Sequence, residues 1–333
     1  MAFIINFFKN ETVFSISLIL AILSCFFVKP NVNYLNYINW DTIILLFLIM
    51  TLVEVLKNLS IFEIIVSKLL LKIGTARELV FLLVFTCFFS SIFITNDVSL
   101  IIFVPFSILA LKKVGRTDLL IFTVSMQTIA ANVGCMVLPI GAPHNIVMYT
   151  ISKIPFESFF MLLLPYIIIS LIFLVIMSFL IPNNPIILPK MNKVEFVKKD
   201  FFKRVFSGVD YYLLLTFIAL FILIGNLQNI ESFALFFREW VVGNEVICGV
   251  VSSQIISNVP AAMLLSGFSS NYEAIIVGIN IGGFGSLIAS MANLISFKIL
   301  IRERDEFKVR YLLEFTALNI VLLVILLGVH FLT

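Results

Sequence analysis

Two polar, glycine-containing segments lie inside stretches that are otherwise apolar enough to sit in lipid. They read NVGCMVLPIGAPHNIV at 132–147 and NIGGFGSLIASMANLI at 280–295. Without any gap, this alignment pairs Asn132 with Asn280, Gly134 with Gly282 and Asn145 with Asn293. Glycine and proline let a helix stop or let backbone approach a ligand, so each segment predicts a helix broken within the membrane. Its repetition indicates an internally duplicated chain.

A helix that stops in mid-membrane exposes groups that can bind ions. Its last carbonyl groups lack partners and can coordinate a cation, while the first amides of the next piece attract an anion. We therefore expect the two breaks, 134–145 and 282–293, to bind substrate or ion through Gly134, Gly141, Pro143, Asn145, Gly282, Gly283, Gly285 and Asn293. The alternatives are close helix packing for the glycines and interhelical hydrogen bonding for Asn132 and Asn280.

Each break follows a second polar tip buried in apolar sequence. The first tip contains Thr95, Asn96 and Asp97, and the second contains Ser257, Asn258, Val259 and Pro260. Hydroxyl and amide groups can both donate and accept hydrogen bonds. A small oxyanion needs donors and a sodium ion needs oxygens, so the matching tips suit either ligand. We expect a possible sodium ion at Asn96, Asn258 and the carbonyls of the helix breaks.

Asp97 is the one acidic residue of the two tips, since the second tip has Val259 at the matching place. An acid within an apolar hairpin is costly to bury charged, so it should be protonated, paired with a cation or in contact with water. The asymmetry predicts a proton or sodium function for the first tip alone. The alternative is that Asp97 caps a helix that begins at Val98. His144, inside the first break, is either a titrating group or part of a tight turn.

The composition places all these residues in a membrane protein. Hydrophobic residues make up 61% of the 333 residues, 12% are charged, and the mean hydropathy is +1.15. Since the hydrocarbon core is about 30 Å thick, runs of roughly 17 to 25 apolar residues predict spanning helices. The predicted fold is an all-α polytopic membrane protein with about seven spans, at 12–28, 40–56, 119–145, 157–181, 210–227, 272–300 and 311–331. Segments 78–111 and 246–268 carry their polar residues in the middle, which predicts re-entrant hairpins.

These elements fall into two units of the same order. Residues 1–39 hold an extra helix, which we interpret as retained rather than as a signal peptide. The first repeat, 40–181, has an amphipathic arm at 58–73, and the second, 210–333, has one at 229–242. A basic cytoplasmic linker, 182–209, joins them. Three crossings in each unit would invert the second relative to the first, an arrangement that recurs in secondary transporters.

The distribution of basic residues predicts the orientation. With a cytoplasmic N-terminus and two re-entrant hairpins, all of the 22 Lys and Arg except Lys29, Lys153 and Arg238 fall on one face. Lys and Arg accumulate in cytoplasmic loops, so this face is predicted to be the cytoplasmic one. We expect a multi-pass protein of the plasma membrane whose C-terminus lies on the outer side. The net charge of +3 is thus a record of topology and not a sign of nucleic-acid binding.

Four segments together resemble a known superfamily. They are TNDVSLIIFVPF at 95–106, PIGAPHN at 139–145, SNVPAAMLLSGF at 257–268 and NIGGFGSLIASMANLI at 280–295. They are similar to the ion transporter superfamily of arsenite permeases, citrate transporters and divalent anion:sodium symporters, and most similar to its uncharacterised anion permease branch. The resemblance covers most of the chain from about residue 40 onward and is specific for the superfamily, not for a substrate.

The resemblance implies binding roles and an assembly. In the symporters the hairpin tips and broken helices hold sodium and the anion, which places that role on Thr95, Asn96, Ser257 and Asn258 and on both breaks. It also implies a homodimer that moves substrate by an elevator-like shift, with the amphipathic pieces as arms. The tips depart from the symporters, which carry serine, asparagine and threonine, because this chain reads TND and SNVP. Asp97 is closer to the arsenite and sodium/proton branches. Only two helices precede the first arm, a short scaffold for the implied dimer.

The function expected from these features is secondary active transport of a small inorganic oxyanion or carboxylate, coupled to a proton or sodium gradient. The alternative within transport is a sodium/proton antiporter that uses Asp97. A channel would share the hairpins but would not need the arms. The sequence contains no paired acids, HExxH, GxSxG or Walker motif, so it favours neither an intramembrane enzyme nor an ATP-driven pump. The expected partners are the small anion, the lipid bilayer and a second copy of the chain; no cofactor is expected apart from the possible sodium ion.

Overall fold

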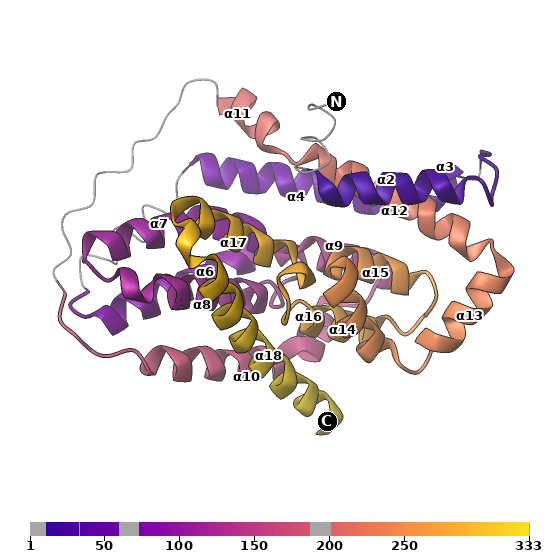
Figure 1. Cartoon of the computed structure of the whole chain (residues 1–333). Coiled ribbons are helices and arrows are strands. Elements are labelled where there is room, and N and C mark those ends of the chain that lie inside the picture. Colours follow the sequence, from indigo (N-terminus) through magenta and orange to yellow (C-terminus); the bar gives the residue numbers. More distant parts are fainter. Residues whose placement is uncertain (1–10, 33, 60–72, 187–200, 333) are drawn as a thin grey trace.

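The computed structural model describes residues 11–32, 34–59, 73–186 and 201–332. Within these ranges the regular structure consists of α-helices and short 3-10 helices, with no β-strand (Figure 1), so the all-α prediction is confirmed. Four stretches in the described ranges are helical, long and apolar enough to cross a membrane: Ala76–Phe93, Phe156–Phe179, Phe201–Gln228 and Asp305–Leu332. The chain is a multi-pass membrane protein.

The first half follows the order expected from the sequence. Its elements are α2 (Thr12–Ser24), α3 (Tyr34–Tyr37), α4 (Trp40–Asn58), α6 (Ala76–Phe93), α7 (Asn96–Lys113), η1 (Thr117–Leu119), α8 (Leu120–Gly134), η2 (Pro139–Gly141), α9 (Pro143–Ser152) and α10 (Phe156–Phe179). Local sequence sets several of these boundaries. Thr75 and Glu78 form a capping box at the start of α6, and Asn39 accepts a hydrogen bond from the Thr42 amide at the start of α4.

The second half has a parallel series of elements. They are α11 (Phe201–Gly208), α12 (Tyr211–Gln228), α13 (Glu231–Val241), α14 (Glu245–Ile256), α15 (Asn258–Ser266), α16 (Tyr272–Gly282), η3 (Leu287–Ala289), α17 (Met291–Glu303), η4 (Asp305–Phe307) and α18 (Lys308–Leu332). Asp210 and Asn271 cap α12 and α16 through their side-chain oxygens. Each predicted broken helix is two helices with a 3-10 turn between them.

The predicted spans and the observed helices differ in three places. The apolar helices α10, α12 and α18 match predicted spans, but the fourth apolar candidate is α6, in the predicted first hairpin. The N-terminal helix ends at Ser24, before the predicted 28. Helix α4 has the expected length but carries Asp41, Glu54 and Lys57, which reduce its apolar character.

Of the two predicted arms and the linker, only the second arm lies wholly within the described residues. The second arm is α13, which leaves Leu235, Phe236 and Trp240 exposed. Residues 60–72 of the first predicted arm and 187–200 of the predicted linker lie outside the described residues. The end of that linker, at 201–208, is helix α11.

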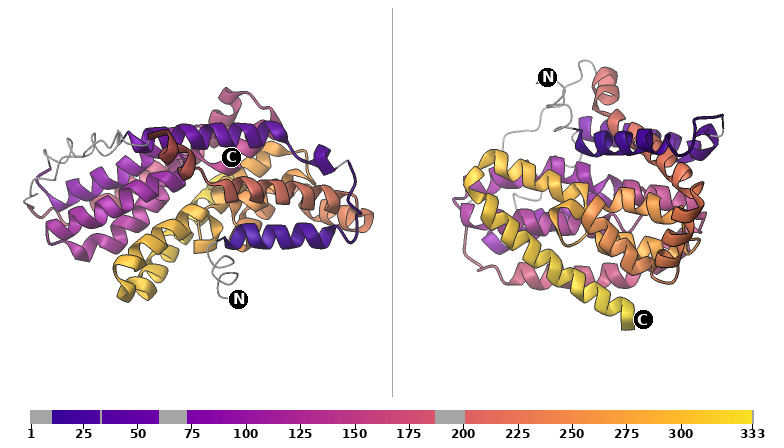
Figure 2. Two further views of the ribbon diagram at one scale, coloured as in Figure 1. Left: turned by 90° about the horizontal axis from the view of Figure 1, so that it is seen from above. Right: turned by 45° about the vertical axis from the view of Figure 1, so that its right-hand side comes forward.

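The helices form layers around the two hairpins. Helices α2, α4 and α12 make one layer, with α12 between the other two when seen from above (Figures 1 and 2). The hairpins and broken helices lie beneath it, and α10 and α18 cover their other side (Figure 1). A large apolar core joins the hairpins, the broken helices, α10 and α18. A smaller one, which includes Leu46, Val147, Phe217 and Met263, lies between the α4–α12 layer and helices α9 and α15.

The two halves are interleaved in the middle layer. The first helix of each hairpin packs on the broken helix of its own half, α6 on α8 and α14 on α16. The second helix packs on both halves: α7 contacts α8 of its own half and α17 of the other, and α15 contacts α16 of its own half and α9 of the other. This exchange brings both tips and both breaks toward the centre of the molecule.

Candidate functional site

The first tip lies between α6 and α7, where Ile94 and Thr95 have extended backbone. Helix α7 begins at Asn96, so Asp97 lies in its first turn, and the alternative that Asp97 caps a helix beginning at Val98 is wrong. Thr95 occupies the cap position without making a side-chain capping bond. The Asn96 amide nitrogen donates to Oδ1 of Asn132 at 2.9 Å, which ties the tip to the end of α8.

The carboxylate of Asp97 is half-buried, and its Oδ1 is buried without a hydrogen-bond partner among the described residues. The backbone N–H of Asp97 donates to Oδ1 of Asn96 at 3.0 Å, which leaves the carboxylate free of the tip's own hydrogen bonds. Its place in the first turn of a helix favours negative charge. An unpaired carboxylate oxygen in this position is suited to accept a proton or to ligate a cation.

The second tip, between α14 and α15, is built differently. Ser257 has a φ of 71°, a left-handed conformation that non-glycine residues adopt at an energetic cost and that is often found at functional sites. Its neighbour Asn258 begins α15, as Asn96 begins α7, and is 3% exposed. The Asn258 Nδ2 group has no hydrogen-bond acceptor within the described part of the chain, so it is the donor of this tip that remains available to a ligand.

The four asparagines of the two broken helices form cross-links between the halves. Asn132 Nδ2 donates to Oδ1 of Asn293 at 2.9 Å, and Asn280 Nδ2 donates to Oδ1 of Asn145 at 2.7 Å. Both bonds join the first piece of one broken helix to the second piece of the other. All four side chains are buried.

The same asparagines also tie down the breaks. The Asn145 amide donates to the carbonyl of Cys135 at 3.0 Å, and the Asn293 amide donates to the carbonyl of Gly283 at 3.1 Å. Cys135 and Gly283 hold matching places in the gap-free pairing of the two segments. Since their amide groups are engaged in these bonds, Asn145 and Asn293 organise the breaks, and direct contact with a ligand would require the bonds to open.

Other contacts within the cluster differ between the halves. In the first half, the tip residue Asn96 donates to Oδ1 of Asn132. In the second half, the matching oxygen is Oδ1 of Asn280, and it does not bond to the tip residue Asn258. It lies 3.3 Å from Nε2 of His144 and accepts a hydrogen bond from Nδ2 of Asn145 at 3.2 Å. His144 is thus part of the asparagine cluster. No hydrogen bond joins the first tip directly to the second among the residues that the structure describes.

Most of the predicted glycines serve close packing. A Cβ on Gly134 would lie 2.2 Å from the Phe88 carbonyl, and one on Gly282 would lie 2.7 Å from Oγ of Ser253, so both glycines let α8 and α16 approach the hairpins. A Cβ on Gly141 would likewise lie 2.6 Å from the Cα of Cys135. Pro143 is the first residue of α9, where the missing N–H costs nothing. The packing alternative therefore accounts for Gly134, Gly141 and Gly282.

The remaining two glycines lie in the second break. Gly285 has a φ of 112°, which other residues rarely adopt. Gly283 has more space, because a Cβ there would be 3.4 Å or more from its nearest neighbours, one of which is Nδ2 of Asn258. The free amide of the second tip and the backbone of the second break thus lie close together.

Gln254 is a site residue that the sequence reasoning missed. Its Nε2 donates to the carbonyls of Gly282 and Phe284, both at 2.8 Å, and its Oε1 accepts from the Ser286 N–H at 2.8 Å. An amide in the otherwise largely apolar run 245–256 was the available signal, since polar side chains in such helices usually have a partner. Only the fold shows that the partner is a helix break.

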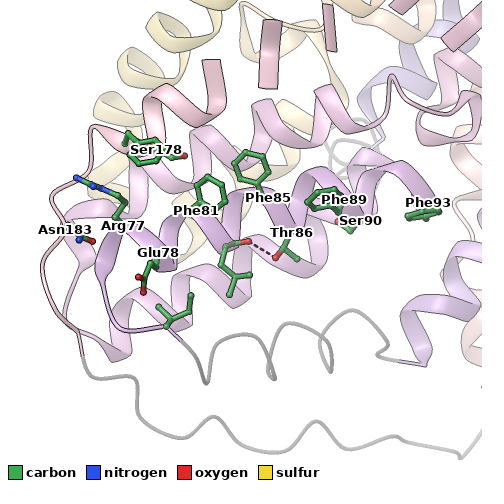
Figure 3. A pocket seen from close by; sticks show the side chains of 13 residues that line it. Arg77, Glu78, Phe81, Phe85, Thr86, Phe89, Ser90, Phe93, Ser178 and Asn183 are labelled. Atoms are coloured by element: carbon green, nitrogen blue, oxygen red, sulfur yellow. Dashed lines mark hydrogen bonds between the residues drawn. The ribbon is translucent and has the colours of Figure 1, made fainter. Parts of the chain in front are cut away.

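A cleft lies on the outside of the first hairpin. It has a volume of about 870 Å³ and extends along the outer face of α6, past Phe81, Phe85 and Phe89 to Phe93 (Figure 3). Arg77 and Glu78 lie at its opposite end. Its lining surface is mostly apolar, which suits a small anion poorly, so we place the candidate site at the tips and breaks.

The kinds of side chain present limit the ions that the site can hold. Within the described ranges, no three His, Cys, Asp or Glu side chains are grouped to hold a metal ion. A cation would instead use carbonyl, amide and hydroxyl oxygens together with Asp97, which are ligands for a hard cation such as sodium. The unpaired Oδ1 of Asp97 fits such an ion in the first half.

Comparison with known proteins gives a consistent family. A family model described as citrate transporter (CitMHS) matches residues 1–271. The "Uncharacterized transporter MJ0456" of Methanocaldococcus jannaschii is 32% identical over 325 residues, covering 86% of this chain and 87% of the relative. The "Inner membrane protein YbiR" of Escherichia coli is 27% identical over 308 residues, covering 79% and 80%. The "Putative transporter arsB" of Dictyostelium discoideum is 34% identical over 128 residues, covering 38% and 22%.

Proposed function

This chain belongs to the citrate transporter family and is a membrane transporter, and from that premise we propose that it is a secondary active transporter of a small anion, an inorganic oxyanion or a carboxylate. Transport would be coupled to a sodium or proton gradient across the cytoplasmic membrane. The observation that carries the proposal is that each tip has one polar group without a hydrogen-bond partner among the described residues. At the second tip it is the amide nitrogen of Asn258, a donor, and at the first tip it is a carboxylate oxygen of Asp97, an acceptor.

The second tip is the better place for the anion. Asn258 Nδ2 is a hydrogen-bond donor with no partner among the described residues, and it lies beside Gly283, whose lack of a side chain leaves room. The strained backbone at Ser257 fixes the amides at the start of α15, where the helix dipole attracts negative charge. These donors would replace the hydration shell of a small anion.

The first tip is the better place for the coupling ion. Asp97 carries the unpaired oxygen, and Thr95 makes no capping bond that would occupy its hydroxyl. A sodium ion held here would supply positive charge near the anion, so that each ligand favours binding of the other. The protein's own part is to hold Asp97 close to the end of α8 through the Asn96–Asn132 bond.

We propose that the halves are inverted repeats with two re-entrant hairpins and that movement is elevator-like. The helices α2, α4 and α12 would form the fixed frame, and the hairpins with the broken helices would move as a body. Two features support this division. The asparagine cross-links join both halves of the moving part, and the core between the frame and helices α9 and α15 is apolar. The hydrogen bond from Gln228 to the Gly267 carbonyl crosses that boundary and would have to break. We further propose that the protein is a homodimer with a cytoplasmic N-terminus.

A sodium/proton antiporter is the second candidate, and Asp97 is the observation that favours it. In that case the carboxylate would exchange a proton for sodium, and no anion would be carried. The free donor at Asn258 would then have no role.

The experiment that separates the two uses purified protein in liposomes. Uptake of labelled citrate, phosphate and arsenite is measured with an inward sodium gradient, an inward proton gradient or neither. Uptake of one anion that requires a gradient supports the proposed function. Sodium-driven proton movement with all of the anions excluded would favour the antiporter and contradict the proposal.

A further inference from the structure

The two breaks differ at one side chain that the paired tips bring into register. When the two tips are aligned in sequence, with Thr95 matched to Ser257, Ile92 of α6 is matched to Gln254 of α14. Ile92 is apolar, whereas Gln254 reaches across to the second break and makes three hydrogen bonds with it. The halves are alike in their elements and yet unlike in how their breaks are satisfied.

Gln254 acts on the second break as a bound cation would. Its Nε2 group, the positive end of the amide, lies 2.8 Å from the carbonyl oxygens of both Gly282 and Phe284. At the end of α16 such carbonyls have no backbone N–H to accept from. They are therefore the groups that would ligate an ion there if Gln254 were absent. A cation in this place would have to displace the amide and would find those oxygens already occupied.

The break is shaped to take this side chain. A Cβ on Gly285 would lie 2.6 Å from Oε1 of Gln254, so the glycine leaves the space that the amide occupies. The positive φ of Gly285 turns the chain so that the Ser286 N–H meets Oε1 of Gln254. The corresponding residues of the first break are Val137 and Leu138, which are not glycine or serine.

The first break lacks such an amide. The carbonyl of Met136, which corresponds to that of Phe284, accepts no hydrogen bond within the described part of the chain. In the same half, Oδ1 of Asp97 has no hydrogen-bond partner among the described residues. The unpaired carboxylate oxygen therefore lies in the first half. The second half has Val259 in place of Asp97, and its break holds an unpaired but uncharged oxygen, Oγ of Ser286.

We propose that Gln254 is a built-in substitute for a bound cation, so that the protein binds one sodium ion, in the first half, and none in the second. The inference rests on the proposed function and deepens it, since it assigns a single coupling cation to a site framed by Asp97 and the first break. The second half then serves the anion alone, with its break held in the shape that a cation would otherwise impose.

Sodium binding by the purified full-length protein tests this directly. Equilibrium dialysis with ²²Na⁺ at constant ionic strength, with choline as the replacement cation, should give one sodium ion per chain. Asp97→Asn should raise the sodium concentration for half-saturation by about tenfold or more, because a charged ligand is lost. Two sodium ions per chain, none at all, or unchanged sodium affinity in Asp97→Asn would each overturn the proposal.

A second set of variants tests the role of Gln254. The double variant Gln254→Ile/Val259→Asp gives the second half the residues of the first and should bind a second sodium ion. Gln127→Ile is the matched control, because Gln127 is a buried glutamine away from the breaks. In the sequence alignment of the two halves it is matched to Ile275, so this change also gives one half the residue of the other. It should bind one. A folded double variant that still binds one sodium ion would overturn the substitute role.

The outcome is separable from that of the anion uptake experiment. One sodium ion per chain with no anion transported would leave the single site standing and remove the proposed function. Anion uptake with two sodium ions per chain would do the reverse.

Discussion

Asn132 and Asn293 are joined by a hydrogen bond of 2.9 Å although they belong to different halves of the chain. Asn280 and Asn145 make the reciprocal bond at 2.7 Å. Each bond runs from the first piece of one broken helix to the second piece of the other, so the two breaks are held at a fixed separation. The hairpin tips, which pack against these pieces, are positioned by the same pair of bonds.

Replacing Asn132 with Ala should destabilise the protein by about 1 to 2 kcal/mol. The change leaves Oδ1 of Asn293 and Nδ2 of Asn96 without partners in a buried site. The melting temperature of the purified protein measures the loss. Asn319→Ala is the control, because Asn319 is also buried but donates only within its own helix, to the Phe315 carbonyl. An equal shift in the two variants would contradict the cross-link.

Replacing Gly134 with Ala should prevent normal packing of α8 on α6. The new Cβ would lie 2.2 Å from the Phe88 carbonyl and from Oγ of Ser91, and the backbone atom cannot move aside without shifting the hairpin. We expect a large loss of folded protein, measured by the monodisperse fraction in size-exclusion chromatography. Gly328→Ala is the control, since no atom of the described residues lies within 4 Å of its added Cβ. Normal yield of Gly134→Ala would show that the packing is looser than described.

Replacing Asp97 with Asn should uncouple transport from its gradient. The amide keeps the shape of the side chain but removes the charge that would ligate sodium or carry a proton. Gradient-driven anion uptake by liposomes should fall about tenfold or more, while thermal stabilisation by the anion survives in part. Coupling equal to that of the unmodified protein would reduce Asp97 to a residue that favours the helix start through its charge.

Replacing Asn258 with Ala should weaken anion binding and leave the fold intact. Its Nδ2 has no partner among the described residues, and the change removes only the long 3.5 Å bond that the Ser257 hydroxyl donates to Oδ1 of Asn258. The anion concentration that gives half-maximal uptake should rise about tenfold or more, with the melting temperature unchanged without ligand. Asn96→Ala is the comparison, because its amide is bonded to Asn132 and its loss should lower that melting temperature. Full anion affinity in Asn258→Ala would remove the second tip from the anion site.

Labelling of single cysteines tests the proposed orientation. Lys29 and Lys308 are both exposed and fall on opposite faces in the proposed topology. In a background without the four native cysteines, Lys308→Cys should react with a membrane-impermeant maleimide only after the cytoplasmic side is opened. Lys29→Cys should react in intact cells. Reaction of both cysteines from the same side would contradict the topology.

The sequence alone determined the class of the protein and the places where its helices break. Apolar length and glycine or proline content act locally, because a missing backbone donor or a left-handed residue favours the end of a helix. The rule is a tendency, since α7 and α10 continue through Pro105 and Pro165. The tips at Asn96 and Asn258 and the breaks after Gly134 and Gly282 therefore lie within a residue or so of their predicted positions. The internal pairing of the two segments was also readable, since it depends only on residue order.

The tertiary structure decided which of these polar residues are occupied and which are free. Asn132 and Asn293 are far apart in sequence, and their bond exists because α8 and α17 pack together. The same packing gives Gln254 a break to satisfy and leaves Asp97 without a partner. Hydrogen-bond partners of buried groups depend on close approach in space, which residue type and spacing do not contain.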